Sequence, residues 1–267
     1  MVRLAPVVTV LLLLGMAGCG TDDGDKTAPD PTPSPTVASD GFLLDFESGL
    51  ELGSDATTIS NAGAANVHTE VKASGEAQVE VVEGPDGGQA VRFPAYTGAA
   101  TAPAAVLVAT DEGSGVLDPG DDEFSFGATF QLDEESAGSE ADNGDNLVQR
   151  GTFDSPGQLK LQLDHDVPSC RIKGDQGEVF VEAEGPVDPG AWYAVTCERN
   201  GSDVELTVKA LGDGAGAGTW HASGPTGSIS LQGLPLTVGG KTGPDGTPVA
   251  SADQFNGAVD DVFLRVE

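Results

Sequence analysis

The segment FSFGATFQL, residues 124–132, places an apolar side chain at every second position, from Phe124 to Leu132. The positions between them carry Ser, Gly, Thr and Gln. Successive side chains of a β-strand point to opposite faces of the sheet. This alternation therefore predicts a strand with one face buried in a core and the other face in water.

The same alternation recurs from Gly41 to the end of the chain, and no stretch shows a helical period. It is clearest in residues 42–46, 79–81, 91–93, 159–163, 179–183 and 204–208. Asn200-Gly201 separates two such runs, and both residues tolerate a positive φ, which predicts a tight hairpin. The 38 Gly and 17 Pro residues fit a protein with many turns. We expect an all-β fold of two antiparallel sheets packed face to face.

Charge limits the classes of partner. The 267 residues include 43 acidic and 12 basic residues, giving a net charge of −31. Such a surface repels nucleic acid and anionic lipid head groups, so neither is expected as a direct partner. Most of the carboxylates are expected to be solvated, although they offer many sites for cations.

The N-terminus has the pattern of a secretory signal. An apolar run, residues 4–14, follows Arg3 and closes with the small residues before Cys19. The run is shorter than the roughly 20 residues that span a bilayer. The site resembles the lipobox of bacterial lipoproteins. That resemblance implies cleavage of residues 1–18, a diacylglyceryl thioether on Cys19, acyl chains such as palmitate, and attachment to the extracytoplasmic face of the cell membrane. An ordinary signal peptide with an incidental cysteine is the alternative.

Residues 19–40 are expected to form a disordered linker after the lipidated cysteine, because prolines alternate from Pro29 to Pro35 and nothing there can build a core. Residues 41–267 then form one domain, which is long enough to bury a sizeable core.

Three motifs in this domain look like one family. They are Trp192-Tyr193-Ala194-Val195, the segment FNGAVDDV at 255–262, and the opening segment LLDFE at 43–47. In this order they resemble the laminin G-like domains of the concanavalin A-like jelly-roll superfold. The segments at 142–151, 160–164 and 169–171 resemble a bacterial, actinobacterial subgroup of that family. Tyr193 departs from the histidine usual in the family, at a position that is normally structural. The resemblance implies that the opening strand pairs beside the closing strand.

If Cys19 carries lipid, Cys170 and Cys197 remain as the only pair in an oxidising compartment, so we expect a disulfide. The loop between them is worth roughly 3–4 kcal/mol by chain entropy. A thiolate metal site or a catalytic thiol would be the alternatives, but no CxxC motif or histidine pattern accompanies these cysteines.

In related jelly rolls a structural calcium joins the first strand to the last. The resemblance implies Asp260 as a ligand here, completed by Glu47 and backbone oxygens near Gly87-Gly88. The alternative is that Asp260 and Asp261 only cap an edge strand. The loop at 142–146 (DNGDN) is a second calcium candidate or else a polar turn, because it lacks the length and final Glu of an EF-hand.

No catalytic pattern was found. The Glu-x-Asp-x-(x)-Glu strand of the glucanases with this superfold is missing, and Glu178 and Glu182 are best explained as solvent-facing strand positions. The histidines are scattered, and the segment GDGAGAG at 212–218 is interpreted as a hairpin connection. Aromatic residues make up only 5% of the chain, so Trp220 and Tyr96 are the only candidates for a sugar platform.

The sequence therefore predicts a membrane-anchored lipoprotein whose laminin G-like domain binds a glycan or protein ligand without catalysis. Two alternatives stay open: a glycan-active hydrolase or lyase, which would need paired carboxylates in a groove, and a structural protein of the cell envelope, which would present an apolar patch on its loops.

Overall fold

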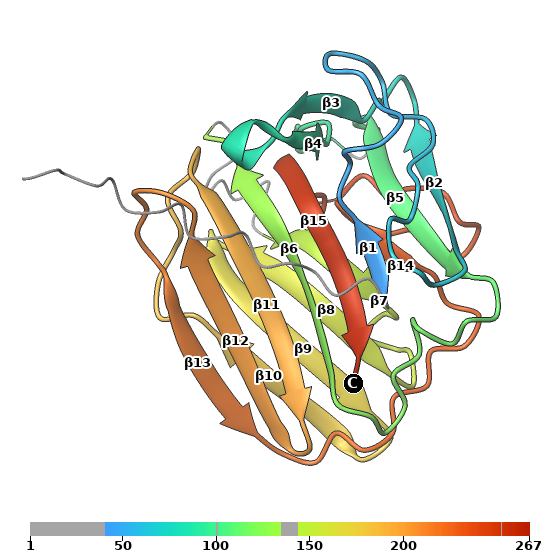
Figure 1. The fold of residues 1–267 in the computed structure, drawn as a ribbon, viewed down its shortest axis with the longest axis vertical. Coiled ribbons are helices and arrows are strands. Elements are labelled where there is room, and N and C mark those ends of the chain that lie inside the picture. The colour runs from blue at the N-terminus through green and yellow to red at the C-terminus, as the bar shows by residue number, and fades with distance from the viewer. Residues whose placement is uncertain (1–40, 100, 135–143, 252) are drawn as a thin grey trace, which may run out of the picture. The chain divides into compact units, whose positions relative to one another are not determined.

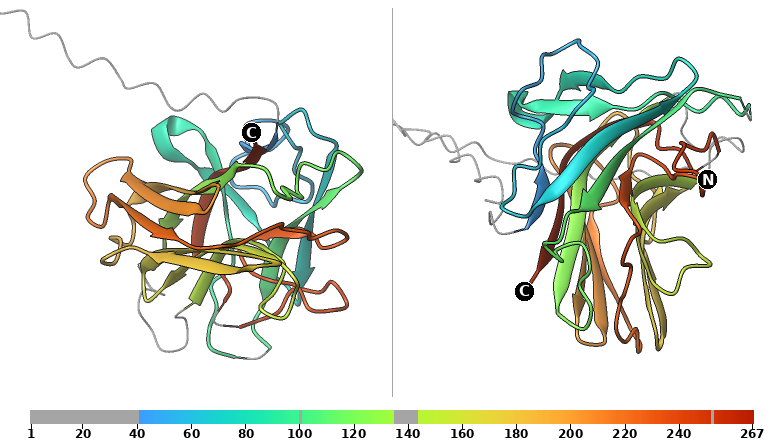
Figure 2. Two further views of the ribbon diagram at one scale, coloured as in Figure 1. Left: turned by 90° about the horizontal axis from the view of Figure 1, so that it is seen from below. Right: turned by 90° about the vertical axis from the view of Figure 1, so that its right-hand side faces the viewer.

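Two antiparallel β-sheets make up the fold of this computed structural model, which describes residues 41–99, 101–134, 144–251 and 253–267 (Figure 1). The side views in Figure 2 show the sheets as two layers. A single 3₁₀ turn, Pro85–Gly87, is the one helical element in these ranges. The expected all-β sandwich is confirmed, and the hydrophobic core lies between its two sheets.

Sheet A has eight strands. In spatial order it runs β13 (Gly218–Ser223), β12 (Asp203–Ala210), β11 (Trp192–Asn200), β6 (Phe124–Leu132), β15 (Gly257–Val266), β4 (Gln89–Arg92) and β3 (Glu80–Glu83), with β1 (Phe42–Leu44) also pairing with β15. The opening strand β1 thus lies beside the closing strand β15, as the resemblance implied.

Sheet B has seven strands. Its order is β10 (Gly177–Glu182), β9 (Val167–Gly174), β8 (Gln158–Asp164), β7 (Gly144–Arg150), β14 (Leu236–Val238), β5 (Ala104–Asp111) and β2 (Val67–Ser74). Leu159, Leu161 and Leu163 of β8 are buried in the core, so Lys160 and Gln162 stand on the outer face of the sheet. We call this solvent side of sheet B the outer face.

A disulfide joins the two sheets through the core. Cys170 of β9 is bonded to Cys197 of β11, with 6.1 Å between their Cα atoms. Both cysteines are fully buried, and Cys197 shares its face with the buried Tyr193 and Val195. The expected pairing is confirmed, and it fixes one layer of the sandwich to the other.

Tyr193 is structural, as expected. Its ring stacks on Phe130 with 5.7 Å between the ring centroids. Its hydroxyl accepts a hydrogen bond from the backbone N–H of Asp188 at 2.9 Å and donates one to the backbone oxygen of Ala215 at 2.8 Å. A phenol can be buried in this way because its hydroxyl both donates and accepts a hydrogen bond, so no polar group is left unsatisfied.

The hairpin and strand β6 each differ in detail from the expectation. Asn200 pairs with Asp203, so the two-residue loop is Gly201-Ser202, one position later than the Asn-Gly pair suggested. Gly201 has the required positive φ of 59°. In β6 the outward Ser125 and Thr129 are buried rather than wet, because these small side chains lie between the neighbouring strands β11 and β15.

Candidate functional site

The predicted signal sequence, Cys19 and the Pro-rich linker lie outside the described residues, as do residues 142 and 143 of the second calcium candidate. The rest of that candidate is not a turn: Asp145 and Asn146 belong to β7 and are buried, and Asp145 accepts a hydrogen bond from the backbone N–H of Asn256 at 2.9 Å. Within the described ranges, no helix is long and apolar enough to cross a membrane.

Four carboxylates lie near the point where the neighbour of β15 changes from β4 to β1. We call Asp45, Glu47, Asp260 and Asp261 the acidic junction. β15 pairs with β4 through residues 258–259 and with β1 through residues 262–264, and a bulge at Asp260 and Asp261 separates the two pairings. Asp261 has a positive φ of 47°, and its N–H donates to Asp260 Oδ1 at 2.8 Å.

The junction brings the two predicted calcium ligands into one region. Glu47 Oε1 accepts a hydrogen bond from the Gln89 N–H at 2.8 Å, and it lies against Gly88, where a Cβ would meet it at 2.5 Å. Burial, followed by the nearby charges of Asp261, Glu47 and Asp45, raises the pKa of Asp260 to about 8. Burial likewise raises the pKa of Asp261.

Side chains alone do not complete a metal centre here. Among the described residues, no three His, Cys, Asp or Glu side chains converge in a way that could hold a metal ion. A calcium ion at the junction would have to take most of its six to eight oxygen ligands from backbone carbonyls and water.

The other predicted polar residues are dispersed. Glu178 and Glu182 are exposed on the outer face of β10, and Glu178 pairs with Arg171 at 2.9 Å. His68, His165 and His221 are all exposed and lie on different elements.

A pocket of about 370 Å³ opens on the outer face of sheet B. It lies over β7 and β14, between the loops that follow β7 and flank β14. It is lined by Gln149, Gly151, Thr152, Ser155, Gly233, Leu234, Pro235, Thr237, Lys241, Thr242, Gly243, Pro244 and Gly246. None of these lining residues carries a carboxylate, whereas glycoside hydrolysis needs two of them about one sugar bond.

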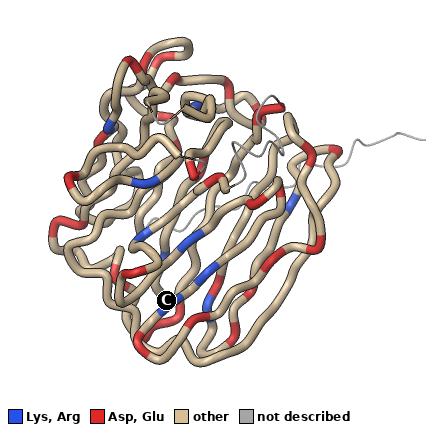
Figure 3. Tube along the Cα trace, turned by 180° about the vertical axis from the view of Figure 1, so that it is seen from behind, with Lys and Arg blue, Asp and Glu red and all other residues tan. Residues whose placement is uncertain are grey.

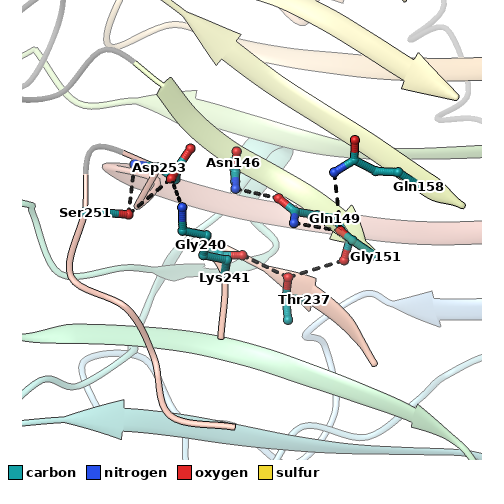
Figure 4. Close-up of polar contacts among 9 residues, drawn as sticks. All are labelled: Asn146, Gln149, Gly151, Gln158, Thr237, Gly240, Lys241, Ser251 and Asp253. Atoms are coloured by element: carbon teal, nitrogen blue, oxygen red, sulfur yellow. Dashed lines mark hydrogen bonds and ion pairs between the residues drawn. The ribbon is translucent and has the colours of Figure 1, made fainter. Parts of the chain in front are cut away.

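Hydrogen bonds fix the floor of the pocket (Figure 4). Asn146 donates to Gln149 Oε1 at 2.6 Å, and Gln149 donates to the backbone oxygen of Gly151 at 2.8 Å. Thr237 donates to the backbone oxygen of Gly240 at 2.9 Å. Lys241 reaches the pocket from the loop after β14 and forms an ion pair with Asp253. The floor is therefore a preformed set of amides and hydroxyls beside one ammonium group.

A second hollow of about 590 Å³ lies near the edge formed by β3 and β4, lined in part by Asp55, Glu80, Arg92 and Asp133. Three of its charged groups are engaged: Arg92 forms an ion pair with Asp133, and Asp55 accepts a hydrogen bond from Gln78 at 2.6 Å. It is less suited to a ligand than the pocket on sheet B.

The exposed aromatic side chains are not those the sequence suggested. Trp220 and Tyr96 are half-buried, and Trp220 packs against the core. Phe180 of β10 is 40% exposed and Phe153, in the loop after β7, is 71% exposed. The sequence held a signal for Phe180, because it alternates with Val179 and Val181, but Phe153 lies in a loop without periodicity.

Comparisons with known proteins support the fold. The sequence matches no protein-family model and no curated protein. The binding domain of Paraclostridial mosquitocidal protein 1 is similar in structure, with a TM-score of 0.52 and 13% identity over 84% of this chain and 48% of that one. So is the binding domain of botulinum neurotoxin DC, in complex with SialylT at a TM-score of 0.53 and with rat synaptotagmin II at 0.50, each at 11% identity over 85% of this chain and 48% of that one.

This chain thus spans about half the length of those solved structures. At such low identity the similarity shows the fold alone. The described residues therefore form a jelly-roll sandwich of the concanavalin A-like type, the architecture shared with these binding domains.

Proposed function

We propose that the domain at residues 41–267 is a non-catalytic, laminin G-like binding module that takes a glycan or protein ligand on the outer face of sheet B. The observation that carries the proposal is the pocket over β7 and β14, where the Gln149 amide, the Thr237 hydroxyl and Lys241 meet above a rigid sheet. A few fixed polar groups in a concave site are what orient a small ligand.

A glycan is the favoured ligand, because the pocket floor presents neutral donors and acceptors that match sugar hydroxyls. The botulinum neurotoxin DC binding domain, with about half of which this chain aligns, has been solved in complex with SialylT and with rat synaptotagmin II. For this chain the absence of carboxylates from the pocket lining supports binding rather than hydrolysis.

Lipidation of Cys19 would place this module on the extracytoplasmic face of the cell membrane. The support for it is the signal pattern of residues 1–19.

Calcium at the acidic junction is a second proposal. The carboxylates of Asp260 and Glu47 are the hard oxygen donors that calcium prefers, and a buried carboxyl whose pKa is raised to about 8 lacks a compensating cation. The ion would hold β1 and β4 against β15.

The binding proposal is tested with two leucines of nearly equal exposure. Leu234 lines the pocket and is 37% exposed, whereas Leu211 lies beyond β12 in sheet A and is 38% exposed. The full chain in detergent is screened against a glycan array, and any ligand found is titrated by calorimetry. We expect Leu234→Asp to weaken binding at least tenfold and Leu211→Asp to leave it unchanged. Equal effects of the two substitutions would refute the pocket as the site.

A further inference from the structure

One lateral row of side chains crosses the outer face of sheet B and ends in the pocket. Phe180 of β10 pairs with Arg171 of β9, which pairs with Lys160 of β8. Lys160 pairs with Gln149 of β7, which pairs with Thr237 of β14. We call these five residues the lateral row. With neighbouring strands about 4.8 Å apart, the row extends for about 19 Å.

The row is open at one end and recessed at the other. Phe180 is 40% exposed, and the Arg171 side chain is 26% exposed. Gln149 and Thr237 are 6% and 5% exposed, because they form the pocket floor beneath the flanking loops. An extended ligand lying along the row would therefore run over an aromatic ring and two cations into the pocket.

The row lies on a face where cations and carboxylates are mixed: Glu70, Glu178 and Glu182 also stand there, and Glu70 and Glu178 pair with Lys72 and Arg171. Five of the 12 Lys and Arg residues stand on or beside the outer face, although the whole chain has a net charge of −31. They are Lys72, Lys160, Arg171, Lys173 and Lys241. Figure 3 shows Lys and Arg positions crossing the strands on this side and Asp and Glu positions along many of the surrounding turns. The lateral row itself contains two cations and no carboxylate.

Of the two cations in the lateral row, Lys160 is the one whose ammonium group has no partner among the residues that the structure describes. Arg171 is held by Glu178 and lies over the Phe180 ring, 5.2 Å from its centroid. Within the described part of the chain, the Lys160 ammonium group has no hydrogen bond or ion pair, although the side chain is half-buried between Gln149 and Arg171. An ammonium group in such a place is stabilised when an anion reaches it.

The titration of Lys160 agrees with this. Burial lowers the pKa of its ammonium group, and the carboxylate of Asp253 does not fully offset that effect. The positive charges of Lys241 and Arg171 lower the pKa further, while Asp164 raises it. Burial is therefore the largest cause of the lowered pKa, and the nearby carboxylates offset it only in part.

We propose that the lateral row binds an acidic polysaccharide, whose carboxylate or sulfate groups meet Lys160 and Arg171 while one sugar stacks on Phe180 and another enters the pocket. This inference rests on the proposed binding function and adds the class of ligand. A polysaccharide fits better than an acidic protein, because the row runs across the strands, includes the partly exposed ring of Phe180 beside Arg171, and ends among amides and hydroxyls. It uses no free strand edge, where an extended peptide would add by β-pairing.

The experiment measures binding of three probes to the full chain in detergent by calorimetry: polygalacturonate, a neutral β-glucan and poly-glutamate. We expect polygalacturonate to bind, and to bind more weakly as salt is raised. Lys160→Gln should weaken it about tenfold, whereas Lys160→Arg, which keeps the charge, should retain most of the affinity. Phe180→Ala should weaken it as well. Lys209→Gln, which removes an exposed charge from β12 of sheet A, is the matched control and should change nothing.

The outcomes separate the inference from the function on which it rests. Equal binding of the neutral β-glucan and polygalacturonate, unaffected by Lys160→Gln, would overturn the acidic ligand and leave the glycan-binding function standing. Binding of poly-glutamate but of neither polysaccharide would overturn it in favour of an acidic protein. If no probe binds and the glycan screen also finds none, the inference and the proposed function fail together. Circular dichroism of each variant confirms that it is folded.

Discussion

At the scale of single residues, Asp260 is the most unusual ionisable group. It is 5% exposed, lies at the bulge of β15, and faces three other carboxylates of the acidic junction. The sequence pointed to this residue only through the family resemblance, since Asp-Asp in an alternating strand is by itself a solvated pair. Its burial follows from the pairing of β15 with β6, β4 and β1, which local sequence does not reveal.

We predict that Asp260 makes the folded protein less stable as pH rises. An unfolded aspartate loses its proton near pH 4, whereas folded Asp260 keeps it up to about pH 8. Between these values the folded state binds more protons, so the free energy of unfolding falls with rising pH, by up to about 1.4 kcal/mol per pH unit. Asp260→Asn keeps an oxygen that accepts the hydrogen bond from Asp261 and should flatten this slope. Urea unfolding between about pH 5 and pH 8, with a chelator present, measures it.

Asp213→Asn, in the exposed loop before β13, is the matched control and should keep the wild-type slope. An Asp260→Asn variant with an unchanged slope would show that the carboxyl is ionised in the folded protein. The same samples test calcium, which would replace the proton: it should raise the melting temperature of the wild type at about pH 8 by several degrees and have no such effect on Asp260→Asn. No calcium shift in the wild type would contradict the calcium proposal.

At the scale of elements, β6 shows which features of a strand an alternating sequence pattern can predict. The pattern correctly predicted the strand and its inward face, from Phe124 to Leu132. It could not predict that Ser125 and Thr129 on the other face are buried, because that depends on the neighbours β11 and β15. The Gly at position 127 had no explanation in the pattern. In the structure, the ring of Phe263 from β15 lies over it.

Gly127→Ala should therefore destabilise the protein by about 2 kcal/mol, the usual scale of overpacking. A Cβ added at Gly127 would lie 2.7 Å from Phe263 Cε1 and would clash with the backbone oxygen of Val195 in the neighbouring strand β11. Gly212→Ala, in a loop where an added Cβ meets nothing within 4 Å, should cost far less. Urea unfolding measures the loss of unfolding free energy in both variants. Equal losses would mean that β6 and β15 can move apart enough to accommodate the added methyl group.

The lateral row marks the limit of prediction for the candidate site. Alternation places Lys160 and Phe180 on outward faces, so their exposure was open to prediction from the sequence. Their alignment with Gln149 and Thr237 depends on the register of the strands and on the pairing of β14 with β7. Thr237 and Gln149, which pair directly, are 88 residues apart in the sequence. No local pattern encodes such long-range pairings. The pocket walls come from loops that have no periodicity at all.

At the scale of the whole molecule, charge and attachment must be considered together. With a net charge of −31, the protein is repelled by anionic lipid head groups, so its surface gives no adhesion to a membrane. Attachment would then depend entirely on the acyl chains that the lipobox resemblance implies at Cys19. A single acyl chain binds membranes only marginally, whereas a diacylglyceryl group supplies two chains and stable anchoring.

We predict that Cys19→Ser moves the protein out of the membrane fraction, either released into the medium or retained as an unprocessed precursor. The physical reason is that Ser lacks the thiol that forms the thioether, while the acidic surface supplies no substitute attraction. Fractionation shows whether the protein has left the membrane, and the mass of the N-terminal fragment shows whether the precursor has been processed. Met16→Leu, which keeps the apolar character of the segment before Cys19, is the matched control and should stay in the membrane. A processed Cys19→Ser protein that remains in the membrane fraction would show that something other than a lipid on Cys19 holds it there, and attachment would then have to be sought in a protein partner.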